Sequence, residues 1–145
     1  MYRHILIPLE NSPYDQIVIE HIRPLAKLVS ARLTLIHVAD GWAARHYEQL
    51  DLQESEELRK DKTYLEQVAQ TLRAEGFEVQ TRLASGEPAK ILRVLDEQQY
   101  DLVAMTTHGH RFLSDLLYGS TANSVRHRTT VPVLLIKAPR PLGKE

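Results

Sequence analysis

Short apolar runs alternate with longer amphipathic stretches along the chain. Five runs are typical of β-strands, at residues 4–8, 33–38, 77–83, 101–105 and 131–136. The third alternates apolar and polar positions, which predicts a half-buried strand at a sheet edge, whereas the others are nearly continuous. Strands without alternation are buried on both faces. The pattern therefore predicts a sheet with covered faces.

Helical spacing fills the intervals between these runs. Apolar positions at residues 17–29 predict a first helix, in which Pro24 predicts a kink or a break near residues 22–23. The pair Ser12-Pro13 resembles an N-cap followed by proline at the first helical position.

The longest helix is predicted for residues 54–75. Its apolar stripe consists of Leu58, Leu65, Val68, Ala69 and Leu72. Gly76 supplies its C-terminal stop. The charge-rich residues 54–62 are interpreted as the solvated face of this helix. Residues 40–53 are predicted to be loop or irregular helix, and two shorter helices are predicted around residues 91–95 and 120–127.

The resulting order of strand and helix, repeated to the last strand, predicts an α/β fold. We expect one doubly wound domain, a five-stranded parallel sheet with helices on both faces, over residues 1–138. Residues 139–145 are expected to form a loose tail. In such sheets ligands lie beyond the carboxyl ends of the strands, where the strand order reverses. Residues 9–12 and 106–109 are therefore the candidate site.

Residues 102–121, LVAMTTHGHRFLSDLLYGST, carry the strongest candidate chemistry. A strand, a glycine at position 109 and a helix start after Gly119-Ser120 suit an anion site, because glycine lets the backbone approach a phosphate and helix N–H groups point at it. The alternative is that Gly109 ends a strand while Gly119 and Ser120 turn and cap a helix.

Composition excludes several classes of protein. The chain has 18 basic and 19 acidic residues, and this balance does not suggest a nucleic-acid-binding surface. It has no cysteine for disulfide or thiolate chemistry. No apolar run approaches the roughly 18 residues of a membrane span. The N-terminal MYRHILIPLE leads directly into a strand pattern and is not typical of a signal peptide. We expect a soluble cytoplasmic protein.

Motifs of the common nucleotide-processing enzymes are missing from the sequence. Neither the Gly-x-x-x-x-Gly-Lys-Ser/Thr phosphate loop nor a Gly-x-Ser-x-Gly nucleophile elbow occurs. We therefore predict no catalytic residue and no efficient phosphoryl transfer. Slow hydrolysis of a bound, metal-chelated nucleotide stays open.

Four motifs together resemble the universal stress protein family: ILIPLENS, LIHV, the GEP turn, and THGHRFLSDLLYGSTANSV before VPVLLI. The resemblance covers residues 2–137 and implies strand order 3-2-1-4-5. The family's ATP-binding branch has Gly, two residues, Gly, nine residues, Gly, then Ser or Thr. This chain has Thr106, Gly109, Gly119 and Ser120 in that register, so three of four positions fit. A second branch lacks the motif and binds no ATP; this chain lies nearer the binding branch.

Two positions depart from the binding pattern. Thr106 replaces its first glycine and brings a stiff, branched side chain toward the ribose. The first-strand loop, usually Pro-x-Asp-Gly-Ser, reads Pro8-Leu9-Glu10-Asn11-Ser12. Glu10 reaches one methylene further than aspartate, and Asn11 can replace glycine because asparagine tolerates positive φ.

The resemblance implies a role for each site residue. Val38, Pro8 and Leu9 would line the adenine pocket, and Glu10 would hold the ribose hydroxyls, unless it is simply a solvated turn carboxylate. Ser120 would contact a phosphate or Mg²⁺, unless it is only an N-cap. The implied ligand is ATP, or ADP or AMP, with Mg²⁺ on its phosphates. Phosphate oxygens would be bound by N–H groups at Gly109, His110, Ser120 and Thr121, with Gly119 allowing close approach. Arg111 would neutralise a phosphate, unless it is simply an exposed loop arginine.

Alternatives remain for the histidines and for the function. His37, His108 and His110 suggest a metal, but no matched second ligand pair is visible, so we predict none. The last strand, from Val131 to Ile136, is the most apolar, and in the family's strand order it is an edge strand. It therefore predicts a homodimer, unless a loop or the tail covers this edge within one chain. The favoured function is a nucleotide-binding regulator of the stress response with an unidentified protein partner; the alternatives are a dimeric module that binds no nucleotide and a slow ATP hydrolase.

Overall fold

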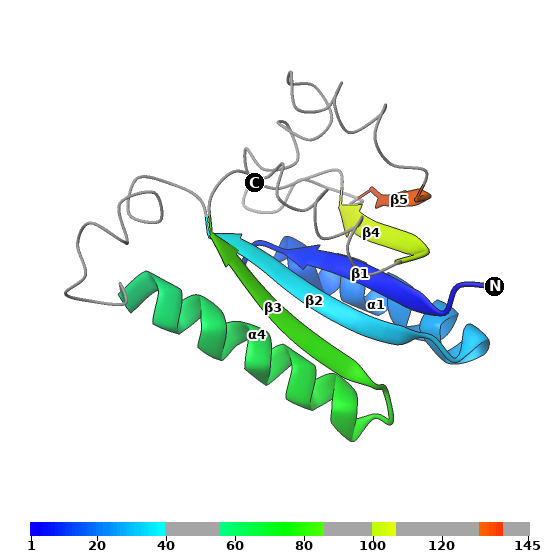
Figure 1. Cartoon of the computed structure of the whole chain (residues 1–145), viewed down its shortest axis with the longest axis horizontal. Coiled ribbons are helices and arrows are strands. Elements are labelled where there is room, and N and C mark those ends of the chain that lie inside the picture. The colour runs from blue at the N-terminus through cyan, green and yellow to red at the C-terminus, as the bar shows by residue number, and fades with distance from the viewer. Residues whose placement is uncertain (40–55, 86–99, 107–130, 138–145) are drawn as a thin grey trace, which may run out of the picture.

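The computed structural model describes residues 1–39, 56–85, 100–106 and 131–137. Its seven described elements are five strands, which form one sheet, and two helices (Figure 1). In chain order these are β1 (His4–Leu9), α1 (Tyr14–Val29), β2 (Arg32–Ala39), α4 (Glu56–Ala74), β3 (Val79–Ser85), β4 (Leu102–Thr106) and β5 (Val133–Ile136). The helices predicted around residues 91–95 and 120–127, the predicted loop 40–53 and the tail 139–145 fall outside the described residues.

The sheet has five strands in the order β3-β2-β1-β4-β5, and every neighbouring pair is parallel. The predicted α/β fold and its strand order are confirmed, including the edge position of β3. From β1 the chain continues to β2 on one side, and from β4 it continues to β5 on the other side, so the strand order reverses between β1 and β4. This is the switch point at which ligands are expected in folds of this kind.

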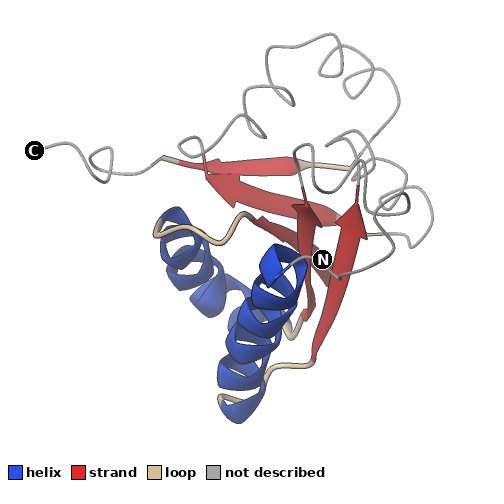
Figure 2. Cartoon of the chain, turned by 90° about the vertical axis from the view of Figure 1, so that its left-hand side faces the viewer, coloured by secondary structure: helices blue, strands red, loops and turns tan. Residues whose placement is uncertain are grey.

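Burial explains why the strands carry almost continuous apolar runs. All six residues of β1 are buried, which requires cover on both faces of the sheet, since successive side chains point to opposite faces. On one face, α1 packs against β1, β4 and β5 while α4 packs against β2 and β3 (Figure 2). The two described helices therefore cover the same side of the sheet.

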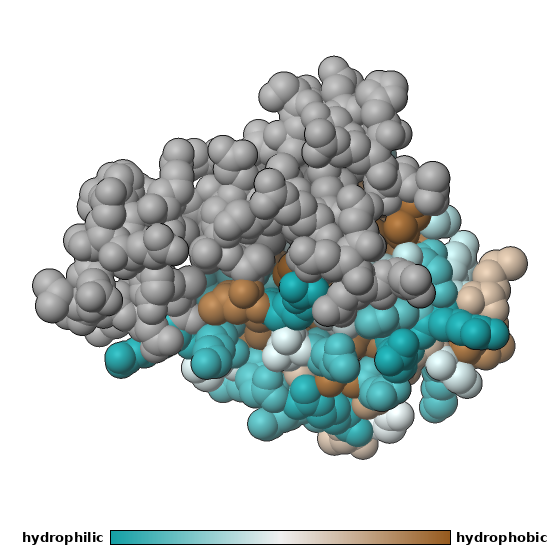
Figure 3. Space-filling view, in the orientation of Figure 1, coloured by the Kyte–Doolittle hydropathy of each residue, from teal (hydrophilic) through white to brown (hydrophobic). Residues whose placement is uncertain are grey.

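The long helix α4 agrees with its predicted stripe where its side chains are described. Leu65, Ala69 and Leu72 are buried in the core, and Val68 packs against it. The helix ends at Ala74, and two residues beyond it Gly76 has a positive φ of 100°, as expected from a glycine stop. The described surface around α4 is mostly hydrophilic in Figure 3. No helix in the described part of the chain combines the length and apolarity needed to cross a bilayer.

Two proline-based predictions need correction. Pro8 was expected to end the first strand, predicted for residues 4–8, but β1 continues to Leu9. Strand β4 pairs with β1 only at Ile5 and Leu6, so Pro8 lies beyond the end of the β1–β4 pairing, where its missing N–H is tolerated. Of the kink or break predicted near Pro24, the break does not occur, because α1 runs through Pro24 to Val29. Pro24 is exposed, so water can bind the carbonyl that its missing N–H leaves without a partner.

The first helix and the last strand begin later than predicted. Helix α1 begins at Tyr14 with Pro13 at the N-cap position, one residue beyond the predicted cap, although the Ser12 hydroxyl still accepts a hydrogen bond from the Tyr14 N–H at 3.2 Å. Strand β5 begins at Val133 rather than at residue 131.

Candidate functional site

The candidate site lies at the carboxyl ends of β1, β2 and β4. Pro8 and Leu9 are the last two residues of β1 and are buried, and the half-buried Glu10 follows directly. Val38 lies near the end of β2, and Thr106 is the half-buried last residue of β4. The structure thus brings these five predicted residues to one edge of the sheet, beside the switch point. The other predicted site residues lie outside the described part: Gly109, His110, Arg111, Gly119, Ser120 and Thr121.

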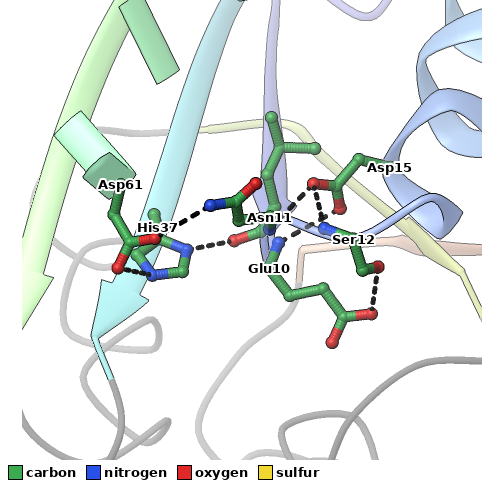
Figure 4. Close-up of polar contacts among 7 residues, drawn as sticks. Glu10, Asn11, Ser12, Asp15, His37 and Asp61 are labelled. Atoms are coloured by element: carbon green, nitrogen blue, oxygen red, sulfur yellow. Dashed lines mark hydrogen bonds and ion pairs between the residues drawn. The ribbon is translucent and has the colours of Figure 1, made fainter. Parts of the chain in front are cut away.

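The loop after β1, residues 10–12, is wrapped around a buried carboxylate (Figure 4). Asp15, in the first turn of α1, is only 3% exposed. It accepts hydrogen bonds from three consecutive backbone N–H groups, those of Glu10 at 3.1 Å, Asn11 at 2.9 Å and Ser12 at 3.2 Å. Successive N–H groups that converge in this way form an anion-binding nest. Here the anion is part of the chain, so these three donors point inward.

Left-handed backbone at Asn11 makes this nest possible. Its φ is 61°, a conformation that asparagine tolerates better than most residues. The Asn11 side chain donates to Asp61 Oδ1 of α4 at 3.2 Å. The expectation that Asn11 replaces a turn glycine is therefore confirmed in its backbone geometry.

Tyr64 of α4 completes the environment of Asp15. Its hydroxyl donates to Asp15 Oδ2 at 2.6 Å. Burial raises the pKa of Asp15, and the hydrogen bonds from Tyr64 and from the Glu10 and Ser12 backbone oppose that rise. Burial and the nearby carboxylate raise the pKa of the Tyr64 phenol, so it remains a donor at physiological pH.

A histidine joins the ends of β1 and β2 to the same helix. The Nδ1–H of His37 donates to the Leu9 carbonyl at 2.8 Å, since a carbonyl only accepts. Its Nε2 lies 3.0 Å from Asp61 Oδ2, and the Asp61 side chain is only 18% exposed. Asp61 thus contacts both the histidine and the loop after β1. His37, considered above as a metal candidate, instead links β1 to α4.

Glu10 has its carboxylate directed away from Asp15, on the other side of the loop backbone (Figure 4). The Ser12 hydroxyl donates to Glu10 Oε1 at 2.9 Å. This contact orients the carboxylate at the open end of β1. A carboxylate held in this way can accept hydrogen bonds from the hydroxyls of a sugar.

Sequence reasoning missed the polar network behind this loop. Asp61 was assigned to the solvated face of α4, and that assignment is wrong for this residue, although Arg59, Lys60 and Lys62 around it are exposed as predicted. The available signal was the spacing of Asp61 and Tyr64, which places both on one helix face. Asp15 carried the other signal, because an acidic residue in a first helical turn faces N–H groups.

Comparison with known proteins gives the family of the chain. The model of the universal stress protein family matches residues 1–137. Universal stress protein MJ0577 of Methanocaldococcus jannaschii is 25% identical over 94% of this chain and 96% of its own length, and universal stress protein MJ0531 of the same organism is 29% identical over 97% and 85%. The solved structure of MJ0577 has a TM-score of 0.75, with 26% identity over 97% of this chain and 99% of that one. The chain belongs to the universal stress protein family.

Proposed function

We propose that the chain is a cytoplasmic regulator of the stress response that binds an adenine nucleotide and acts as a homodimer through nucleotide-dependent contacts. The observation that carries this proposal is the oriented carboxylate of Glu10 beside the switch point of the sheet. A carboxylate has acceptors for both hydroxyls of a ribose, and the buried end of β1 lies next to it.

In this proposal each part of the nucleotide has its own residues. Pro8, Leu9 and Val38 line the adenine side, Glu10 holds the ribose, and the backbone of Thr106 lies against the sugar. The phosphates, with any Mg²⁺ they carry, would be bound by Gly109, His110, Arg111, Gly119, Ser120 and Thr121. ATP is the favoured ligand, with ADP and AMP as alternatives.

Solved structures of the same fold support the choice of ligand. One universal stress protein, with a TM-score of 0.63 and 17% identity to this chain, is in complex with cAMP. Another, from Archaeoglobus fulgidus, with a TM-score of 0.64 and 20% identity, is in complex with dAMP. Both ligands are adenine nucleotides, so this fold accommodates an adenine nucleotide in those two proteins.

A sheet edge supports the homodimer. In β5, Val133 is 45% exposed and Leu135 is 40% exposed, and the strand is at the end of the sheet. An exposed apolar edge strand is a ready template for pairing, and pairing with a second copy would cover it. This observation equally favours the second candidate function, a dimeric interaction module that binds no nucleotide.

Calorimetric titration with ATP, ADP and AMP separates the two candidates. We expect saturable binding of at least one nucleotide, with affinity strongly reduced in Gly119→Val, whose branched side chain would block the phosphate, and in Glu10→Gln. Glu66→Gln makes the same chemical change on α4 away from the site and serves as the control.

Absence of binding by the parent protein to all three nucleotides would refute the nucleotide proposal and leave the dimeric module. An affinity of Gly119→Val within about twofold of the parent would refute the phosphate-loop assignment. A phosphate-release assay on the parent and on Glu10→Gln tests whether the bound nucleotide is slowly hydrolysed.

A further inference from the structure

Two side chains of α4 reach the loop after β1 from behind. Tyr64 and Asp61 lie three residues apart, hence on one helix face, and contact the loop at two separate points. Tyr64 bonds the carboxylate of Asp15, around which the loop is wrapped, and Asp61 bonds the Asn11 side chain. These contacts join positions about fifty residues apart in the chain.

The loop depends on support of this kind because its own conformation is unfavourable. Asn11 has a left-handed backbone, and Asp15 is a carboxylate withdrawn from water that needs all of its donors. Within the part of the chain that the structure describes, Asp15 accepts four hydrogen bonds, and Tyr64 supplies the one side-chain donor among them. Without it, one carboxylate oxygen loses a partner in a buried place, and the nest that fixes the backbone of residues 10–12 is weakened.

The contacts of Asp61 act on the same loop from its other side. Asp61 bonds the Asn11 amide at the loop and His37 at β2, and His37 in turn holds the carbonyl of Leu9, the residue before Glu10. Residues on both sides of Glu10 are therefore tied to α4, while the Glu10 carboxylate is directed away from this helix.

We propose that Asp61 and Tyr64 are positioning residues: they hold the loop 10–12 in the conformation that aims Glu10 at the ligand, and they set an affinity for nucleotide without touching it. The choice of nucleotide as ligand rests on the function proposed above. The inference that α4 holds the loop does not rest on it, because that inference uses only contacts within the chain.

Single substitutions test the two residues in turn. Tyr64→Phe removes only the hydroxyl, and Asp61→Asn removes only the charge. Each lowers nucleotide affinity by roughly threefold to tenfold, the effect of one lost hydrogen bond acting through the loop. Glu66→Gln also changes a carboxylate of α4, one that contacts Arg73 on the same helix and Thr81 on β3, and it leaves the affinity unchanged. Equal losses in all three variants would show general loosening of α4 and would overturn the proposal.

A double-mutant cycle with Glu10→Gln separates positioning from a merely structural role. If Tyr64 acts through Glu10, then adding Tyr64→Phe to Glu10→Gln produces little further loss of affinity, since the aimed carboxylate is already gone. A purely structural effect would instead multiply with the Glu10→Gln effect. Full multiplication of the two losses refutes the positioning role.

Amide spectra of the ligand-free protein keep this test independent of the nucleotide proposal. Tyr64→Phe and Asp61→Asn shift the backbone amide resonances of residues 10–12, whereas Glu66→Gln does not. If the parent binds no nucleotide, the function proposed above fails and these shifts alone decide whether α4 sets the loop. Unshifted loop amides in both α4 variants overturn the proposal whatever the parent binds.

Discussion

The backbone of Asn11 offers a direct test of the loop on which the site depends. L-residues pay roughly 1–2 kcal/mol in the left-handed region, and asparagine is among the residues that tolerate it best. At φ 61°, Asn11→Val adds a branched side chain where it fits worst. Asn11→Gly instead removes the strain. Both variants lose the side-chain bond to Asp61, so that loss cancels when they are compared.

We expect Asn11→Val to be less stable than Asn11→Gly by about 2 kcal/mol, a difference of roughly thirtyfold in the unfolding constant. Asn11→Gly lies within about 1 kcal/mol of the parent, because relief of strain offsets both the greater freedom of glycine in the unfolded chain and the loss of the exposed hydrogen bond to Asp61. Urea-induced unfolding followed by circular dichroism measures both free energies. Under the proposed function, the valine variant loses more nucleotide affinity than the glycine variant, because both lose the Asn11 contact to Asp61 but only the valine side chain also forces the loop out of the conformation that directs Glu10.

Ser30 provides a matched control in the same protein. It ends α1 with φ 56° and ψ 43°, nearly the same left-handed conformation, at the opposite end of the helix from the site. Ser30→Val should therefore cost a similar free energy of unfolding and leave nucleotide affinity unchanged. Equal stability of the valine and glycine variants at position 11 would refute the left-handed loop, and a loss of affinity in Ser30→Val would refute the link between this loop and the ligand.

Three further predictions follow from other parts of the chain. Burial lowers the pKa of His4. The stabilisation of the folded protein by neutral His4 is therefore fully present above the ordinary pKa of about 6.5, and it is lost as the pH falls through the lower pKa of the folded state. In urea unfolding, the midpoint should fall less on acidification in His4→Gln than in the control His21→Gln, which changes an exposed histidine. Thr106→Gly should tighten nucleotide binding in calorimetry if its side chain crowds the ribose, and weaker binding would identify its hydroxyl as a ligand contact. Leu135→Lys should convert the proposed dimer to a monomer by light scattering, whereas Leu28→Lys, at a residue 82% exposed on α1, should not; a monomeric parent at micromolar concentration would contradict the dimer outright.

The topology could be predicted from the sequence because burial on both faces leaves a strong signal. Runs such as residues 5–7 and 102–105 are apolar at consecutive positions, as expected for a parallel strand covered on both faces. Because ligands bind beyond the carboxyl ends of parallel strands, the predicted strand ends then pointed to Glu10 and Thr106 without any knowledge of their contacts. The failures concerned single residues whose effect depends on the neighbouring strand or on solvent, namely Pro8 and Pro24.

The network behind the loop could not be predicted in the same way. Asp61 lies within a charged stretch and follows the rule that charges on an amphipathic helix face water. Its partner His37 is distant in sequence, and only the packing of α4 against β2 brings them together. Tyr64 was not among the predicted stripe positions, and its hydroxyl acquires a role only because Asp15 is buried beneath the loop.

The nest around Asp15 also limits how this loop can recognise a ligand. Its three N–H groups are the donors that would ordinarily attract a phosphate, and an internal carboxylate already binds them. A second anion brought to the same place would meet the charge of Asp15 and find these donors engaged. The group directed away from Asp15 is instead the Glu10 carboxylate, which the Ser12 hydroxyl orients and which suits the hydroxyls of a sugar. Under the proposed function, recognition therefore divides between two segments of the chain: the end of β1 binds the ribose, and the phosphates are bound by residues within 109–121.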